Sequence, residues 1–306
     1  MPLSSNMRSA IFMIVAMAGF TISDAISKAV IGHISFGQLL FVRGCAATAI
    51  IAVIVWRKGL FAHSRKLLHI SVLWRCVGEV GATLTFMAAL SQMPLANVHA
   101  ILQALPLAVT MGAALFLAEQ VGWRRWMAIA AGFIGVLIVV RPGMEGFTGY
   151  SILTLISVAF CALRDLATNR IPREVPSMLV STLTAAIVTV AGALIIVPQG
   201  GWQPLGSYHL GLILTAAVIL LFGYHFLIMS MREGDLSFVA SFRYTGLLWA
   251  IALGYLVFGD VPDALTLTGS AIVVASGIYT LYRERKAGKP KVVTKSTGPS
   301  MAPDGL

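Results

Sequence analysis

Eight charged side chains stand inside runs of apolar residues that are long enough to cross a bilayer. Asp24 with Lys28, and Arg75 with Glu79, are each four residues apart, so each pair shares one helix face and can form an ion pair. A charge at membrane depth is costly unless it faces a protein interior or a water-filled pathway. As a set, these charges predict a polar pathway; they are Asp24, Lys28, Arg43, Arg75, Glu79, Arg164, Asp165 and Arg243.

Two acidic–basic clusters suit gates at the two mouths of such a pathway. By the rise of a helix, Asp24 and Lys28 lie toward the outer side of the first span, whereas Arg164 and Asp165 lie toward the inner side of the sixth. We therefore expect these residues to help form alternate gates. The alternative is that they form fixed ion pairs that only stabilise helix packing.

The third span offers a candidate for proton coupling. Glu79 lies nearer the midplane than Arg75, and burial of a carboxyl group favours its protonated form. A carboxyl group that gains and loses a proton could couple transport to a proton gradient. The alternative is that Arg75 neutralises Glu79 permanently.

Arg243 is the leading candidate for binding a solute. Its planar guanidinium could hold a carboxylate, a phosphate or a carbonyl edge. The neighbouring Tyr244, and Trp249 further along the same span, offer ring faces to an aromatic or cationic solute. The alternatives are an arginine tied to backbone carbonyls and aromatic side chains that face lipid.

Further polar residues of the spans join this candidate binding set. Arg43 stands in the second span, Gln103 aligns near Arg243 between the two halves of the chain, and Tyr224 and His225 stand in the eighth span. Each has a structural alternative as a satisfied core group. Pro106 removes one helical hydrogen bond and aligns with Gly246, so matched kinks at the two positions would suit a hinge.

The composition places the chain among integral membrane proteins. It is 58% hydrophobic and only 11% charged, about half the charged share of a soluble domain. Apolar runs predict ten transmembrane helices, at 9–31, 35–56, 68–91, 95–117, 126–140, 149–168, 177–197, 209–231, 236–258 and 265–282. The runs are continuous instead of alternating, which excludes a β-barrel. The fold class is therefore an all-α integral membrane protein.

The basic residues predict an orientation with both termini in the cytoplasm. With that orientation only Arg141 lies in an outer loop. Sixteen of the 22 Lys and Arg residues lie on the inner side: Arg8, Arg57, Lys58, Arg65, Lys66, Arg124, Arg125, Arg170, Arg173, Arg232, Arg283, Arg285, Lys286, Lys289, Lys291 and Lys295. The net charge of +10 is thus explained by membrane orientation, and no nucleic-acid partner is expected.

The two halves of the chain resemble each other. Segment 21–28 matches 161–169 and 115–120 matches 256–261, at an offset of 141 residues that places Asp24 over Asp165, and 130–140 matches 274–282 nearly at the same offset. Each half holds five spans, an odd number, so the second must enter the membrane from the opposite side. We expect two inverted five-helix repeats, at 8–143 and 148–284, and a disordered basic cytoplasmic tail at 285–306.

These residues carry a family resemblance. Arg75 opens the third span, a PLA turn stands at 94–96, Pro106 lies in the fourth span, and WRRW at 123–126 precedes a glycine-bearing helix that ends in RPG. This pattern resembles the first half of an EamA-type member of the drug/metabolite transporter superfamily, and FGDVPD at 258–263 marks a similar second half. The resemblance implies ten helices around a central cavity that carries a small organic solute.

We therefore expect a secondary transporter of a bacterial inner membrane that moves a small metabolite by alternating access. The stretch SFRYTGLLWA at 241–250 resembles members that take up S-adenosylmethionine or riboflavin. An amino-acid or drug exporter of the same superfamily is the alternative within the class, and a channel or a scaffold the alternative outside it. The sequence lacks hydrolase, zinc and phosphate-loop motifs, so no enzyme, cofactor or metal site is expected.

Overall fold

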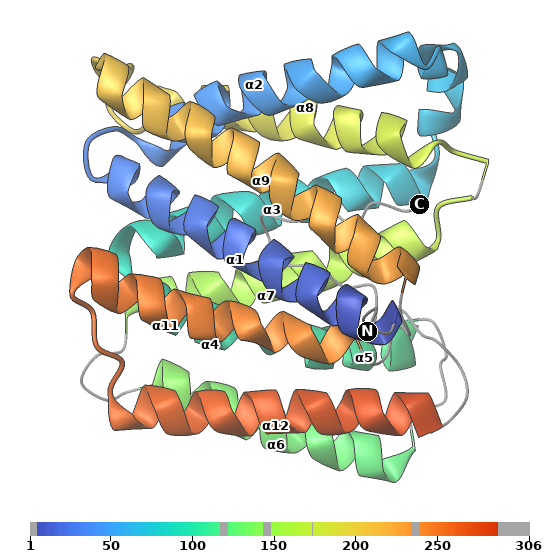
Figure 1. Ribbon diagram of the computed structural model, residues 1–306, viewed down its shortest axis with the longest axis vertical. Coiled ribbons are helices and arrows are strands. Elements are labelled where there is room, and N and C mark those ends of the chain that lie inside the picture. The colour runs from blue at the N-terminus through green and yellow to red at the C-terminus, as the bar shows by residue number, and fades with distance from the viewer. Residues whose placement is uncertain (1–4, 117–121, 143–147, 173, 234–238, 287–306) are drawn as a thin grey trace.

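The computed structural model describes residues 5–116, 122–142, 148–172, 174–233 and 239–286. Helices fill most of these ranges (Figure 1). In chain order they are α1 (Ser5–Ile31), α2 (Phe36–Arg57), η1 (Leu60–Leu67), α3 (Ile70–Gln92), α4 (Leu95–Leu102), α5 (Leu105–Phe116), α6 (Trp123–Val140), α7 (Gly149–Asn169), α8 (Ser177–Ile196), α9 (Ser207–Glu233), η2 (Ser241–Tyr244), α11 (Thr245–Phe258) and α12 (Ala264–Lys286).

Ten segments are long and apolar enough to cross a membrane, which confirms the predicted number. α4 and α5 together make the fourth of them, and η2 with α11 makes the ninth. The fifth span begins at Trp123 instead of 126. The predicted start of the ninth span at 236 lies outside the described residues, as does nearly all of the predicted tail.

The helices pair across the two halves of the chain. α1 packs along α9 and α3 along α7, while α2 packs along α8 and α6 along α12. The α2–α8 and α6–α12 pairs lie at opposite ends of the molecule, with the other helices between them (Figure 1). If the first five spans are exchanged, in order, with the last five, the α1–α9 pair becomes the α7–α3 pair. The α2–α8 and α6–α12 pairs then stay as they are. This pairing is what an inverted repeat requires.

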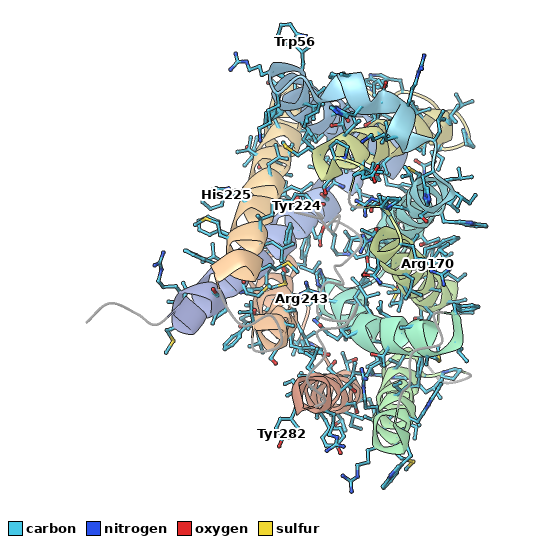
Figure 2. All side chains as sticks on the ribbon, turned by 90° about the vertical axis from the view of Figure 1, so that its right-hand side faces the viewer. Trp56, Arg170, Tyr224, His225, Arg243 and Tyr282 are labelled. Atoms are coloured by element: carbon cyan, nitrogen blue, oxygen red, sulfur yellow. The ribbon has the colours of Figure 1, made fainter. Side chains whose placement is uncertain are left out.

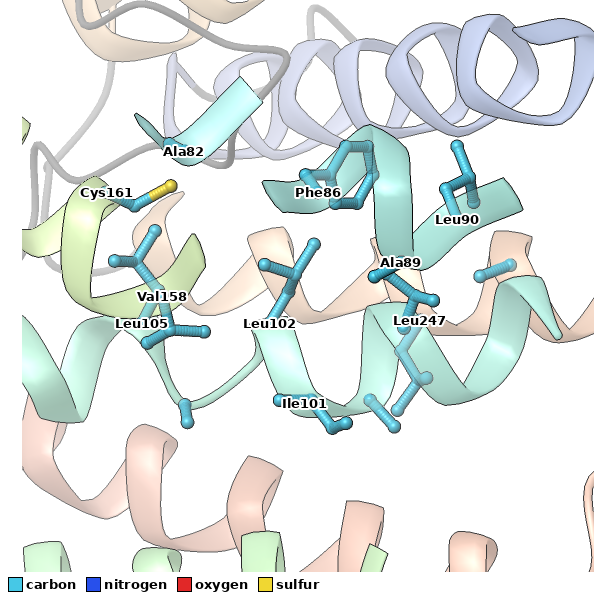
Figure 3. Packing of buried hydrophobic residues seen from close by; sticks show 14 of the residues in the cluster. Ala82, Phe86, Ala89, Leu90, Ile101, Leu102, Leu105, Val158, Cys161 and Leu247 are labelled. Carbon is cyan, nitrogen blue, oxygen red and sulfur yellow. The ribbon is translucent and has the colours of Figure 1, made fainter. Parts of the chain in front are cut away.

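Both halves also change helix geometry at equivalent positions. The fourth span is interrupted at Gln103 and Ala104, where the chain makes a tight turn before Pro106, because proline supplies no N–H to continue the ladder. Figure 3 shows Leu102 and Leu105 on the two sides of this interruption. In the second half, the tighter η2 turn ends at Tyr244 and α11 begins. The fourth span is therefore interrupted just before Pro106. Gly246 lies in the first turn of α11, after the corresponding change of helix type in the ninth span.

Glycines permit the close contact between α6 and α12. A Cβ added at Gly135 of α6 would lie 2.8 Å from the carbonyl oxygen of Gly269, and one added at Gly269 would lie 2.6 Å from that of Gly135. Such close approach of two backbones needs glycine on both sides. The α6–α12 pair is thus held at backbone contact distance.

The outer surface is apolar, as contact with lipid requires. Large hydrophobic side chains are exposed along the spans, among them Leu115, Val190, Leu194, Val218 and Leu256. Exposed tryptophans stand near span ends, including Trp56 and Trp123, where an aromatic ring suits the level of the lipid headgroups.

Candidate functional site

Arg243 is the basic side chain whose hydrogen-bonding capacity is least used in the described part of the chain's interior. It lies in η2, within the ninth span, and is half-buried. Its Nε and one terminal nitrogen, Nη1, are buried without a hydrogen-bond partner among the described residues, and Nη2 reaches only the sulfur of Met231 at 4.0 Å. Figure 2 shows Arg243 on the inner side of the α9 and α11 layer.

Tyr244, next to Arg243, is packed against α12. Its hydroxyl oxygen would lie 1.6 Å from a Cβ built on Gly277, so the phenol occupies the space that this glycine leaves free. The side chain is 6% exposed and its hydroxyl has no hydrogen-bond partner among the described residues. The Tyr244 phenol is thus packed against α12 at Gly277.

A first group of polar residues, the Asp24 cluster, joins α1, α2 and α4. It consists of Asp24, Ser27, Arg43 and His99, all buried. Asp24 Oδ2 lies 3.4 Å from His99 Nε2, and Arg43 Nη1 donates to Ser27 Oγ at 3.1 Å while attracting Asp24 electrostatically. Arg43 therefore compensates the charge of Asp24 within the protein.

A second group, the Arg164 cluster, joins α3 and α7. It consists of Arg75, Glu79, Arg164, Asp165 and Thr168. Arg164 is fully buried; its Nη2 lies 2.8 Å from Asp165 Oδ1 and its Nη1 lies 3.4 Å from Glu79 Oε2. One arginine thus holds two carboxylates. Its helix packs so closely on α3 that a Cβ at Gly78 would lie 2.8 Å from the Arg164 backbone nitrogen.

Two of the predicted ion pairs are wrong. Arg75 does not pair with Glu79 on its own helix; its Nη1 donates to Thr168 Oγ1 on α7 at 2.7 Å. Lys28 does not pair with Asp24; its Nζ donates to the carbonyl oxygens of Leu90 and Met93, at 3.0 and 2.7 Å. In both cases a neighbouring helix supplies a partner in a better position than the residue one turn away.

Lys28 and Arg170 make similar contacts at opposite ends of the transmembrane spans. Lys28, at the end of α1, lies over the ring of Phe258 at the end of α11, 5.5 Å from its centroid. Arg170, directly after α7, donates from Nη2 to the carbonyl oxygen of Phe116 at the end of α5, at 3.0 Å. At the offset of the repeat, Arg170 lies one residue after the position that corresponds to Lys28, and Phe258 lies one residue after the position that corresponds to Phe116. Lys28 is half-buried and holds two carbonyls, whereas Arg170 is exposed and holds one.

The remaining predicted site residues are dispersed. His225 is exposed and lies on the outer side of α9, opposite the inner side occupied by Tyr224 (Figure 2). Trp249 is exposed, outside the buried face of α11 formed by Gly246, Leu247, Ala250 and Gly254. His225 therefore points away from the protein interior, and Trp249 is the more exposed of the two aromatic candidates on the ninth span.

Tyr224 and Gln103 remain near the interior. Tyr224 contacts the Phe20 ring edge-on at 5.2 Å and interacts electrostatically with Arg43. Gln103 is half-buried and ends α4, and its backbone N–H donates to the carbonyl oxygens of His99 and Ala100. Gln103 thus lies at the break between α4 and α5, whereas Tyr224 lies between α9 and α1.

His99, Ser27 and Thr168 belong to the clusters but are missing from the predicted site. Serine and threonine are uncharged, and histidine is not counted among the charged residues, so a search for charges within the spans passes over all three. A search for polar residues one or two helical turns from each charge would have found Ser27, since it lies three residues after Asp24. His99, on α4, is brought to Asp24 on α1 only by the tertiary fold, which the spacing along the sequence does not show.

Comparison with known proteins agrees with this architecture. Residues 7–141 match the model of the EamA-like transporter family. The chain is 30% identical over 212 residues to a riboflavin transporter of Vibrio cholerae, covering 69% of this chain and 70% of that protein. It is 24% identical over 281 residues to an S-adenosylmethionine uptake transporter of Rickettsia conorii, covering 90% and 93%.

An exporter is among the similar proteins too. The pseudopaline exporter CntI of Pseudomonas aeruginosa is 24% identical over 282 residues, covering 90% of this chain and 96% of the exporter. A solved structure with 17% sequence identity superposes with a TM-score of 0.60, covering 92% of this chain and 99% of the other. That superposition shows the same fold across the whole length.

Proposed function

As a member of the EamA-like transporter family, in the drug/metabolite transporter superfamily, this protein is a multi-pass membrane transporter of a small metabolite, and we propose that Arg243 is the residue that binds the solute. The unused hydrogen-bonding capacity of its guanidinium carries the proposal. A buried donor without a partner costs free energy, and so does a charge at membrane depth. An anionic or carbonyl group on the solute would supply the missing acceptors.

The ninth span is tightened but continuous around Arg243. η2 ends at Tyr244 and α11 begins at Thr245, whose N–H donates to carbonyl oxygens of η2. Binding of an anionic group at this position is therefore assigned to the Arg243 guanidinium itself.

The proposed solute is a metabolite of the size and polarity of S-adenosylmethionine or riboflavin. Two of the similar proteins carry these names, and both compounds offer groups that a guanidinium can hold, a carboxylate in one and carbonyl edges in the other. Export of an amino-acid-like compound is the second candidate, since a pseudopaline exporter covers the chain equally well. The sign of net flux separates the two.

Alternating access would use the similar Lys28 and Arg170 contacts as gates. Each joins the end of one span to the end of another at one side of the membrane, and the repeat relates the two contacts to within one residue. In this conformation the Lys28 contact is the more extensive, with two carbonyl oxygens and an aromatic ring. The state described is then closed at the Lys28 side. Opening that side would break these contacts as the Arg170 side tightens.

We place both termini in the cytoplasm of a bacterial cell and the protein in its inner membrane. The excess of Lys and Arg in the loops on one side supports this orientation. The Lys28 contact then faces the periplasm and the Arg170 contact the cytoplasm.

Proton coupling belongs to the same proposal, but Glu79 is not suited to it. Glu79 Oε2 lies 3.4 Å from Arg164, and arginine stays protonated in proteins. A carboxylate beside a permanent cation is held in its ionised form. Uptake into proteoliposomes with and without a pH gradient, and with a protonophore, would test whether protons drive transport.

Thermal stabilisation of the purified protein by candidate solutes is the test of the binding role. Wild type and Arg243→Ala would be compared with S-adenosylmethionine, riboflavin and a panel of amino acids. A compound that stabilises wild type only, and that exchanges across proteoliposomes in counterflow, supports the proposal. Equal stabilisation of both proteins by the transported compound would remove Arg243 from the binding site.

A further inference from the structure

The contact between Asp24 and His99 differs from every other buried ion pair that the structure describes. Asp24 is 1% and His99 7% exposed, and their nearest atoms, Oδ2 and Nε2, are 3.4 Å apart. Neither Asp24 Oδ1 nor His99 Nε2 has a hydrogen-bond partner among the described residues. The two groups are close, but no well-directed hydrogen bond fixes them in one protonation state.

The Arg164 cluster provides the contrast within the same protein. There Arg164 Nε donates to Asp165 Oδ1 at 2.9 Å, in addition to the contacts through its terminal nitrogens. Arginine keeps its proton in proteins, so the cation of that cluster is permanent. A histidine ring can be neutral or protonated, so the contact of Asp24 with His99 permits a change of charge that the Arg164 cluster does not.

The neighbours of the pair allow both charge states. Arg43 on α2 attracts Asp24 electrostatically, so the carboxylate is compensated when His99 is neutral. Lys28, one turn along α1, is held by the two carbonyls at the end of α3. The Phe86 ring on α3 contacts the His99 ring edge-on at 6.3 Å.

The other elements packed against α1 and α4 contribute further titratable and charged groups. They are Cys45 and Arg57 on α2, Arg75, Cys76 and Glu79 on α3, Arg124 and Arg125 on α6, Tyr150, Cys161, Arg164 and Asp165 on α7, Tyr208, His209, Tyr224 and His225 on α9, Arg243 and Tyr244 on η2, Tyr255 on α11, and Tyr279, Tyr282 and Arg283 on α12. Asp260, after α11, attracts Lys28 electrostatically. Among acidic side chains of the described residues, Asp24 alone forms an ion pair with His99.

From this geometry we propose that Asp24 and His99 form a proton-binding site, in which His99 Nε2 takes a proton from water on one side of the membrane and returns it on the other. With the proton bound, His99 is an imidazolium paired with the Asp24 carboxylate. With the proton gone, neutral His99 no longer holds Asp24, and Arg43 compensates the carboxylate alone. This proposal rests on the transport function proposed above and names the site of its coupling.

The position of the pair links the proton to movement. Asp24 lies one turn before Lys28, the cation of the more extensive gate contact, and His99 lies one turn before the break that ends α4. A change in the attraction between them therefore acts on the contact between α1 and α4. Protonation strengthens that contact and loss of the proton weakens it.

The first experiment reads the proton site without any solute. Nuclear magnetic resonance of histidine-labelled protein in detergent would follow the His99 ring signal, assigned by its loss in His99→Gln, across about pH 5 to 8. We expect His99 to titrate reversibly, and its midpoint to move in Asp24→Asn. A His99 signal that stays unchanged over this range would overturn the proposal.

The second experiment measures coupling in proteoliposomes with S-adenosylmethionine and riboflavin as probes. We expect His99→Gln and Asp24→Asn to lose about tenfold or more of the acceleration by a pH gradient while keeping counterflow, which needs no gradient. His33→Gln, an exposed histidine after α1, is the matched control and should keep the acceleration. Full acceleration in His99→Gln would refute the proton site.

The two experiments also separate this proposal from the transport function. If wild type shows no counterflow with any probe while His99 titrates with Asp24, the proposed solutes fail and the proton site stands. If counterflow is robust but neither His99 nor the gradient response depends on Asp24, the transporter stands and the proton site fails. Size-exclusion profiles and thermal unfolding of each variant identify those that fail to fold, and His99→Asn is the second variant for assigning the ring signal if His99→Gln does not fold.

Discussion

Glu79 on α3 pairs with Arg164 on α7, 85 residues away in the sequence, and not with Arg75, one turn away on its own helix. The same guanidinium also holds Asp165, so a single buried cation neutralises two anions. The charge balance of the α3–α7 contact therefore depends on one arginine.

Replacing Arg164 should therefore destabilise the protein strongly. Arg164→Met leaves two buried carboxylates without their cation, and breaking a buried pair by removing one partner costs about 3–5 kcal/mol. Thermal unfolding in detergent would measure the loss, with exposed Arg57→Met as the control. Glu79→Gln should cost less, because Arg164 keeps Asp165. Equal unfolding temperatures for Arg164→Met and Arg57→Met would contradict this view of the cluster.

Arg243 should govern binding more than folding. A solute present at 100 times its dissociation constant stabilises the native state by about 2.7 kcal/mol, and Arg243→Ala should lose most of this gain. Arg243→Lys should recover only part of it, since an ammonium cannot make the two parallel hydrogen bonds of a guanidinium. The control is Trp249→Leu on the exposed side of α11, which should bind like wild type. A shift that survives in Arg243→Ala would argue against this site.

The glycine contact between α6 and α12 should not tolerate a methyl group. Gly135→Ala would place Cβ 2.8 Å from the Gly269 carbonyl oxygen, a backbone atom that cannot rotate away. Overpacking of this kind costs about 1–3 kcal/mol. Gly122→Ala is the matched control, because nothing lies within 4 Å of a Cβ there. Unfolding temperatures would show the difference, and the prediction fails if both variants shift alike.

The loop after α6 should contribute stability that depends on pH. Arg141 hydrogen-bonds to Asp263 before α12, and this bond, together with the Thr266 N–H, holds the pKa of Asp263 below its usual range. A lowered carboxyl pKa stabilises the folded state above the unfolded value, about 4, and the contribution is lost as the pH falls below it. Asp263→Asn should therefore be less stable than wild type at neutral pH, and the gap should close in acid.

Thermal unfolding of both proteins from neutral to acidic pH would follow that gap. Because Asp263 is about half exposed, solvent screening keeps the effect small. Arg141→Gln should reproduce the neutral-pH loss and add nothing to Asp263→Asn. A gap that grows toward acid would mean that the sign is wrong.

The gates should respond in opposite directions. Lys28→Ala removes a cation that holds two carbonyls, so a cysteine on that side should become more accessible to a membrane-impermeant reagent. Arg170→Ala should favour opening at the other side and protect that cysteine. The background would replace the three native cysteines by serine. The same direction of change in both variants would sink the gate assignment.

The elements of the fold follow from the sequence because the bilayer fixes their length. An apolar run of about 20 residues allows few structures other than a helix, and Pro106 determines where the fourth span breaks. The inverted repeat is visible because segments such as 21–28 and 161–169 kept similar residues at one offset. These are local or periodic signals, which a single sequence carries.

The partners of the charges do not follow in the same way. Spacing of four residues shows that Asp24 and Lys28 share a helix face, but the rotation and neighbours of that helix decide what each one meets. Lys28 meets two carbonyls of the α3 end, and Asp24 meets His99. His225 was misplaced for a related reason: successive residues of a helix point about 100° apart, so its neighbour Tyr224 faces inward while His225 faces outward.

The pairing of helices across the two halves determines how the chain can assemble. α1, α2, α3 and α6 each find their most extensive contact in the opposite half, and contacts between successive helices of one half are slight. Neither half is therefore a folding unit with a core of its own. A fragment cut between residues 142 and 148 would leave its main packing surface uncovered, and two complementary fragments synthesised together should recover the cooperative unfolding that either one lacks.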